Sequence, residues 1–253
     1  MTNDYKLEIC ANSVASCLEA QKGGAWRVEL CAAIPEGGTT PSYGDIALAR
    51  ELLQIKLHVI IRPRGGDFLY SHLEHRIMLK DIENANRLEA DGVVIGCLTP
   101  EGEVDMARNR ELMDAAAGMS VTFHRAFDMC LDPYDSLERI IELGCDRLLT
   151  SGQQPRAEDG IELLHELVKK ADNRIIIMPG SGVNANNIAK LAKETGAREF
   201  HLSARESVES GMLYRNPNLK MGGDRIFIDE YTQQVTSAEK VAETLINWKN
   251  KSE

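Results

Sequence analysis

Two copies of a Glu-x-Cys triplet give the sequence its most reactive side chains. Glu8-Ile9-Cys10 and Glu29-Leu30-Cys31 each end a short segment with the composition of a β-strand. Neighbouring strands lie about 4.8 Å apart, and two thiolates that share one metal ion need about 4.6 Å, at ~2.3 Å for each metal–sulfur bond. Cys10 and Cys31 therefore suit Cu(I), which thiolates prefer over harder ions. Two cysteines on adjacent strands are also common as small core residues, so that alternative stays open.

A second set of side chains has the types needed for proton transfer. Side chains alternate along a strand, so the residues between the apolar ones share the opposite face. Here that face carries ionisable groups, at Glu8, Glu29, Arg62, His124 and His201. The glutamates suit a general base, the histidines a general acid or base, and Arg62 an anchor for an anion, which makes all five candidate catalytic residues. The alternative is a closed network in which the two glutamates neutralise Arg62 and His124, because unpaired buried charges are costly.

Two turns near the end of the chain are suited to binding an anion. The segment 179–183, Pro-Gly-Ser-Gly-Val, follows one predicted strand, and Ser203-Ala204 follows the next. Barrels of parallel strands commonly bind a phosphate at these two positions through backbone N–H groups. We therefore predict anion contacts at Gly180, Ser181, Gly182 and Ser203. A tight turn that needs the backbone freedom of glycine would have the same sequence.

Short apolar segments that position these residues alternate with longer segments of helical period along the whole chain. Eight segments have the pattern of strands: 6–9, 27–30, 57–61, 92–95, 120–123, 147–149, 174–178 and 199–202. Such alternation is typical of a parallel sheet covered by helices, and eight parallel strands close a barrel. One face of each strand then meets the helices and the other meets the barrel axis.

Helical periodicity occupies the intervals between these strands. The predicted helices are 14–22, 43–53, 73–89, 105–117, 133–143, 158–171 and 185–195, with a last one at 237–249. Glycines at 23–24, 118, 144 and 196 follow helical patterns, as expected at helix ends. The sequence therefore predicts an α/β fold, a single (β/α)₈ TIM barrel over residues 1–253, with a loop and a helix as an extension after the eighth strand.

The composition narrows the classes of partner. A formal net charge of −10 disfavours binding to nucleic acid or to an acidic membrane surface. No apolar stretch approaches the ~20 residues that span a bilayer, and the start of the chain lacks the pattern of a secretory signal. The 6 cysteines show neither CxxC nor zinc-type spacing and are expected to be free thiols in a reducing compartment. We expect a cytoplasmic protein.

Several longer segments together resemble the CutC family, whose members are named as copper homeostasis proteins. In order they are GGAWRVELC (23–31), EGGTTPSYG (36–44), IRPRGGDFLYS (61–71), GVVIGCLTPEGEVD (92–105), TFHRAFD (122–128), PGSGVN (179–184) and SGMLYRNPNLKMG (210–222). RPRGGDF and TFHRAFD are the most specific of them. The chain departs from the family pattern at Trp26, where Asp is common, and at Ser181, where a third Gly is common.

The resemblance implies a TIM barrel, a cytoplasmic location, a homodimer or homotetramer, and copper handling in which Cys10 and Cys31 bind Cu(I). It names no reaction. The hard, polar side chains of RPRGGDF and TFHRAFD, including Arg62, Arg64 and His124, suit a small anionic molecule instead. One alternative is therefore an uncharacterised barrel enzyme, a lyase, isomerase or hydrolase that acts on an anionic or phosphorylated metabolite. Loop residues that only fix the rim of the barrel, and a structural oligomer with no activity, are further alternatives.

Overall fold

Eight parallel strands form the centre of the molecule. The computed structural model describes residues 6–218 and 229–250. The strands are β1 Lys6–Ala11, β2 Arg27–Leu30, β3 Lys56–Ile60, β4 Gly92–Ile95, β5 Ser120–Phe123, β6 Arg147–Thr150, β7 Ile176–Pro179 and β8 Glu199–Leu202. They pair in the order β7-β6-β5-β4-β3-β2-β1-β8, and β7 lies against β8, so the barrel is nearly closed. This confirms the predicted (β/α)₈ fold.

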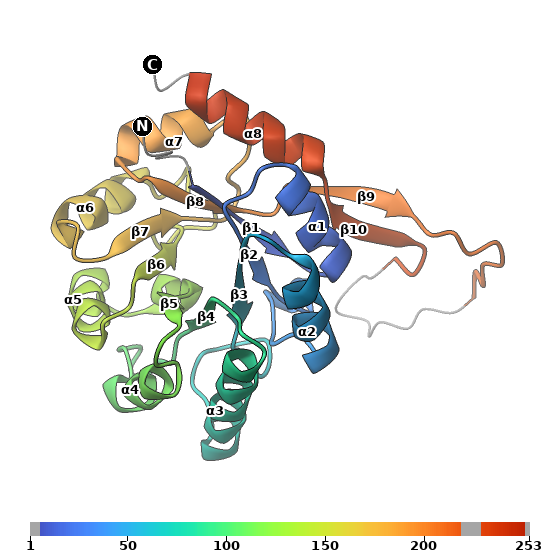
Figure 1. Ribbon diagram of the computed structural model, residues 1–253. Helices are drawn as coiled ribbons and strands as arrows, with labels where there is room; N and C mark the ends of the chain where they lie inside the picture. Colours follow the sequence, from blue (N-terminus) through green and yellow to red (C-terminus); the bar gives the residue numbers. More distant parts are fainter. Residues whose placement is uncertain (1–5, 219–228, 251–253) are drawn as a thin grey trace.

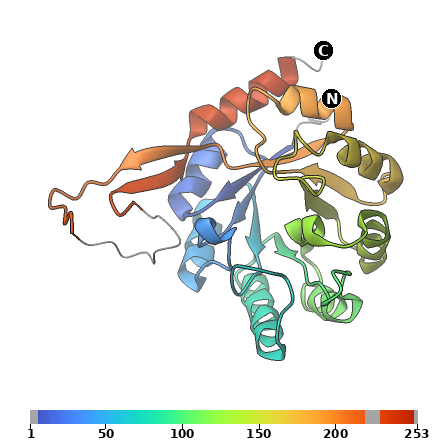
Figure 2. The same ribbon diagram turned by 180° about the vertical axis from the view of Figure 1, so that it is seen from behind.

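Helices surround the strands, as Figures 1 and 2 show from opposite sides. They are α1 Val14–Lys22, α2 Tyr43–Leu52, α3 His72–Arg87, α4 Met106–Ala115, α5 Pro133–Leu143, α6 Ile161–Ala171, α7 Ile188–Thr195 and α8 Ala238–Asn250, with short 3₁₀ turns η1 Ile34–Glu36 and η2 Arg125–Met129. Each predicted helix is present, with ends that differ by up to three residues. Within the described ranges, no helix is long and apolar enough to cross a membrane.

Local sequence signals account for several of the helix ends. Ser71 and Glu74 form a reciprocal capping box at the start of α3. Asp132 caps the backbone N–H groups at the start of α5, where Pro133 occupies the first turn. The same helix ends at Gly144, whose φ of 85° lies in the left-handed region that glycine adopts without steric cost. These ends fix where each following strand begins.

Ion pairs link several strands inside the barrel, near the N-terminal ends of the strands. Arg27 in β2 contacts Glu8 in β1 and lies 3.0 Å from Glu199 in β8. Arg147 in β6 reaches the same Glu199 carboxylate at 2.7 Å. Since Glu8, Arg27 and Glu199 are all buried, their charges depend on each other for compensation. A salt-bridge network therefore exists, but Arg27 neutralises Glu8 in it, in place of the Arg62 and His124 that the sequence predicts.

The segment after β8 differs from the loop that the sequence predicts. Strands β9 Arg205–Glu209 and β10 Thr232–Thr236 pair in antiparallel fashion and project away from the barrel (Figure 1). Both strands consist mainly of exposed polar residues, so they lack the alternation of apolar residues by which the sequence predicts a strand. The C-terminal helix is present as α8, whereas the start of the chain and residues 219–222 of the segment 210–222 lie outside the described residues.

Candidate functional site

A cavity of about 610 Å³ opens at the C-terminal ends of the strands. Its size is typical of pockets for small molecules, and its position is the one that barrel enzymes use. Eight predicted site residues line it: Cys10, Glu29, Arg62, His124, Ser181, Gly182, His201 and Ser203. The remaining four, Glu8, Cys31, Arg64 and Gly180, lie outside the lining, and their surroundings are described below.

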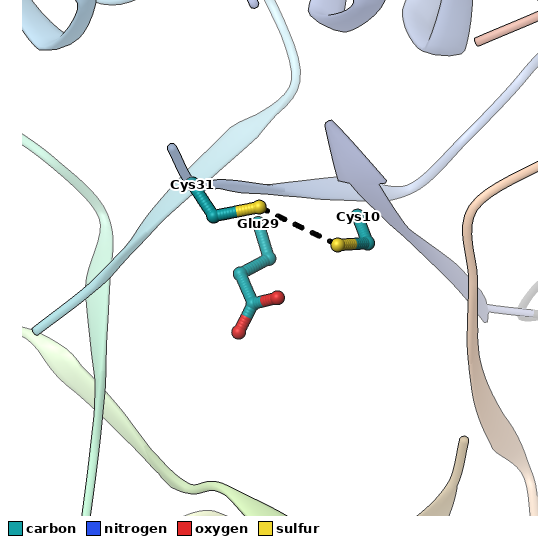
Figure 3. Close-up of side chains that lie close together, drawn as sticks. All are labelled: Cys10, Glu29 and Cys31. Atoms are coloured by element: carbon teal, nitrogen blue, oxygen red, sulfur yellow. Dashed lines mark hydrogen bonds between the residues drawn. The ribbon is translucent and has the colours of Figure 1, made fainter. Parts of the chain in front are cut away.

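Cys10, which lines the cavity, lies beside Cys31, which does not. The register places Cys10 in β1 beside Glu29 in β2, so Cys31 follows one residue after β2 and sits diagonally across. The two side chains nevertheless point toward one another, with 3.5 Å between their sulfurs (Figure 3). A carboxylate oxygen of Glu29 joins them in a group whose ligand atoms all lie within 4.8 Å of one another. Two soft donors and one hard donor therefore converge at a single point.

The two thiols differ in their readiness to ionise. The hydrogen bond from Cys31 lowers the pKa of Cys10 well below its usual value, against the effect of burial and with help from the positive charges of His201 and Arg205. Arg205 places a guanidinium nitrogen 3.4 Å from the Cys10 sulfur. The same hydrogen bond between the two thiols, together with burial, raises the pKa of Cys31. Ionisation is therefore favoured at Cys10 and disfavoured at Cys31.

Glu29 and His201 complete this wall of the cavity. Burial raises the pKa of Glu29 to about 8, although the charge of His201 works in the opposite direction. One carboxylate oxygen of Glu29 lies 3.8 Å from the His201 Nε2, and the other has no hydrogen-bond partner within the described residues. Burial alone would lower the pKa of His201, but its contacts with Cys10, Glu8 and Glu29 raise it well above its usual value.

Glu8 lies beneath the cavity and is fully buried. Burial alone would raise its pKa, but the charges of Arg27, His201 and His58 lower it far below its usual range. Its carboxylate accepts a hydrogen bond of 2.8 Å from the His201 Nδ1. Glu8 therefore orients His201 from below and makes no contact with the open space above it.

Arg62 and His124 form the opposite, harder side of the site. Arg62 follows β3, and its guanidinium donates to the backbone carbonyls of Glu36, Gly38 and Gly66, each at 2.8 Å. His124 follows β5, and burial together with Arg62 lowers its pKa to about 3. Both side chains pack on Phe68, at 5.0 Å from its ring centre in each case. Neither approaches Glu8 or Glu29 within ion-pair distance in the described structure, so the network predicted between them is not formed.

The predicted anion residues separate into two groups. Arg64 points to the outside of the barrel, where it binds Glu74 at 2.6 Å and Asp67 at 2.9 Å and fixes the loop after β3. Ser181 and Gly182 form a turn with φ of 73° and 76° at the mouth of the cavity. Gly180 lies just below them, against Leu149 and His201. Ser203 joins the lining from the end of β8.

Arg205, Phe68 and Asn184 line the cavity without having been assigned to the site from sequence. Arg205 is the first residue of β9, which the sequence does not predict as a strand, so its place in the cavity wall does not follow from the sequence pattern. Arg125 and Asp128, which belong to the TFHRAFD segment, also line the cavity. Asp128 accepts hydrogen bonds from Arg125, Thr150 and Ser151, so this pair fixes the rim of the barrel as one alternative predicted.

Comparison with known proteins agrees with the fold and with the segments around the cavity. The model of the CutC family matches residues 5–206, which include every strand of the barrel. The chain belongs to the CutC family. A CutC family protein of Bacteroides thetaiotaomicron is 62% identical over 242 residues, which cover 95% of this chain and 97% of the relative. One from Porphyromonas gingivalis is 51% identical over 95% of this chain and 96% of the relative.

Solved structures place this CutC chain among the TIM barrels. The crystal structure of CutC from Streptococcus agalactiae, provisionally described as a copper homeostasis protein, has a TM-score of 0.76 and 38% identity. The match covers 79% of this chain and 98% of that one. Thiamine phosphate pyrophosphorylase from Pyrococcus furiosus has a TM-score of 0.60 at 17% identity over 98% of both chains, which shows a shared fold alone.

Proposed function

We propose that this CutC protein binds Cu(I) as its cargo, between the sulfurs of Cys10 and Cys31. The observation that carries the proposal is the 3.5 Å separation of these sulfurs at the ends of two neighbouring strands. Two metal–sulfur bonds of about 2.3 Å can span any separation up to about 4.6 Å, so the pair can hold one ion without a change of backbone. The description of the S. agalactiae relative as a copper homeostasis protein supports the same ion.

The donor set favours a soft monovalent cation. The lowered pKa of Cys10 favours the thiolate, the form that binds metals, and thiolate sulfur prefers Cu(I) over Mg²⁺ or Ca²⁺. A carboxylate oxygen of Glu29 lies within 4.8 Å of both sulfurs, and the Glu29 side chain lines the cavity. Cys10 lines the cavity, so an ion can reach it from that side. Cargo bound there remains exchangeable, as a role in copper handling in the cytoplasm requires.

Competition for Cu(I) tests the proposal. The reduced protein is titrated without oxygen against a coloured Cu(I) chelator, beside the variants Cys10→Ser and Cys31→Ser. We expect one tightly bound Cu(I) per chain, and at least a hundredfold weaker binding in each variant because a serine oxygen is a poor ligand for a soft ion.

A third cysteine provides the matched control. Cys145 is buried near Met113, away from the cavity, so Cys145→Ser leaves the Cu(I) affinity unchanged if the assignment is right. Wild-type binding in Cys10→Ser and Cys31→Ser, or an equal loss in all three variants, contradicts the proposal.

A further inference from the structure

Arg62 is a buried cation without an anionic partner. Its side chain is 5% exposed, and within the described residues no carboxylate lies within ion-pair distance of it. Its hydrogen bonds go to three neutral carbonyls, and among the described residues its Nε atom forms none. The buried Tyr70 hydroxyl lies close enough for the Arg62 charge to oppose the rise that burial causes in the pKa of that phenol, but a neutral phenol does not balance the charge. An arginine cannot shed its charge at physiological pH. Its position on the cavity wall therefore leaves a positive charge for a ligand to neutralise.

His124 provides a second unused donor next to Arg62. It is 3% exposed, and its Nδ1 accepts the backbone N–H of Ala126 at 3.2 Å. A neutral imidazole that accepts at Nδ1 carries its proton on Nε2. Within the described residues this Nε2 has no hydrogen-bond partner, and the ring lines the cavity. Because Phe68 packs on both side chains, the two donors are held on one rigid wall.

A third group of donors lies on the far side of the barrel mouth. The turn at Ser181 and Gly182 has positive φ at both residues, and its backbone N–H groups at Gly182 and Val183 have no acceptor in the described structure. The N–H of Ser203, after β8, also has none. Strands β3 and β7 are four places apart in the order of eight, so this turn and Arg62 face each other across the cavity. Convergent backbone N–H groups of this kind bind phosphate oxygens.

The balance of charge in the cavity favours an anion. Arg62, Arg125, Arg205 and His201 line it, and the acidic groups in the same lining are Glu29, Asp128 and the Cys10 thiol. Asp128 already accepts hydrogen bonds from four residues of the rim, including Arg125 and Thr150. The chain as a whole has a net charge of −10. The excess of positive charge is therefore confined to the cavity and is not a property of the whole protein.

We propose that the cavity binds a small phosphorylated molecule that carries a second oxygen-bearing group, a carboxylate or a carbonyl, at its other end. The phosphate lies on the N–H groups of the Ser181–Val183 turn and Ser203, and the second group lies on the cavity wall that Arg62 and His124 form. The inference goes beyond Cu(I) binding because none of these contacts uses Cys10 or Cys31. It assigns RPRGGDF and TFHRAFD, which contain no soft metal ligand, to recognition of a metabolite.

Calorimetric titration of the metal-free, reduced protein tests this site. The probe is phosphoglycolate, which has both groups, and the comparison ligands are inorganic phosphate and glycolate. We expect phosphoglycolate to bind at least tenfold more tightly than either comparison ligand. Equal affinity for phosphoglycolate and inorganic phosphate overturns the two-ended site, and no binding of any of the three overturns the anion site altogether.

Matched variants test which residues are responsible. Arg62→Lys keeps the charge but loses Nε, and His124→Asn loses the Nε2 donor, so each should weaken phosphoglycolate at least tenfold. Arg64→Lys is the control, because the Arg64 guanidinium faces Glu74 and Asp67 instead of the cavity. Circular dichroism shows whether each variant is folded, and having two independent variants keeps the test decisive if one is not. Unchanged affinity in a folded Arg62→Lys or His124→Asn protein contradicts the assignment. Binding in Cys31→Ser at the wild-type level separates this site from the copper proposal.

Discussion

Among single residues, the hydrogen bond between the two thiols lowers the pKa of Cys10 and raises that of Cys31. The lowering does not follow from burial, because an isolated buried thiol has a raised pKa, as the pKa of about 12 for Cys17 illustrates. The hydrogen bond from Cys31 and the nearby charges of His201 and Arg205 reverse that direction for Cys10 only. This difference in pKa between the two thiols affects how the Cu(I) affinity depends on pH.

Copper binding is expected to release one proton. Because the pKa of Cys10 is lowered and that of Cys31 is raised, Cys31 is the sulfur that must lose a proton when the ion binds. The Cu(I) affinity should therefore increase about tenfold for each unit of pH between 6 and 8. The measurement is chelator competition at several pH values, with the chelator's own protonation taken into account. A pH-independent affinity, or a hundredfold change per unit, contradicts the release of a single proton.

Among the secondary-structure elements, the end of α1, the first helix, packs closely against α8, the last helix. Gly23 ends α1 with an ordinary φ of −74°, so its lack of a side chain is a matter of space. A Cβ atom there would lie 2.6 Å from the Ala238 carbonyl oxygen and 2.6 Å from the Val241 Cβ. The C-terminal helix can therefore seat against the barrel only because residue 23 is glycine.

Gly23→Ala should destabilise the protein by about 1–3 kcal/mol through this steric conflict. Gly44→Ala is the matched control: Gly44 lies in α2, and its nearest atom would be 3.8 Å away. Since alanine favours a helix over glycine, that variant should be neutral or more stable by up to about 1 kcal/mol. Urea denaturation gives the free energy of unfolding of each. Equal stability of Gly23→Ala and the wild type shows that α8 does not pack as described.

The sequence predicts the elements of the barrel better than the partners of its polar residues. Alternation along β1 and β2 correctly places Cys10 and Glu29 toward the axis, because a strand has a fixed period of two. It does not predict that Glu8 pairs with Arg27 or that Arg62 has no carboxylate, since those pairings depend on the register of several strands. The β9–β10 pair was missed because its strands are polar and exposed, without the apolar alternation that identifies a half-buried strand.

At the scale of the whole molecule, the projecting β9–β10 pair is the feature that the barrel does not explain. Its base is held by the Asn12 side chain, which donates to the Gln234 carbonyl at 2.8 Å, and by packing of α1 on β10. Beyond the strands, Met212, Leu213 and Tyr214 are exposed. Two strands alone are only marginally stable in water, so a second copy of the chain that covers them would add stability.

The homodimer or homotetramer remains a prediction, and we expect the β9–β10 pair to form its interface. Sedimentation velocity should give a mass that is a multiple of 28.0 kDa. The double variant Leu213→Ser, Tyr214→Ser should shift that mass to the monomer without loss of secondary structure. A wild-type protein that sediments as a monomer, or an oligomer unaffected by the double variant, removes this interface.

X-ray absorption at the copper edge shows directly whether Cys10 and Cys31 together hold one Cu(I). Protein loaded with one equivalent of Cu(I) under reducing conditions should show two sulfur neighbours at about 2.3 Å. The sulfur signal should fall to at most one neighbour in Cys31→Ser and remain at two in Cys145→Ser. A copper environment of nitrogen and oxygen alone, or two sulfurs that persist in Cys31→Ser, would place the ion elsewhere and contradict the account.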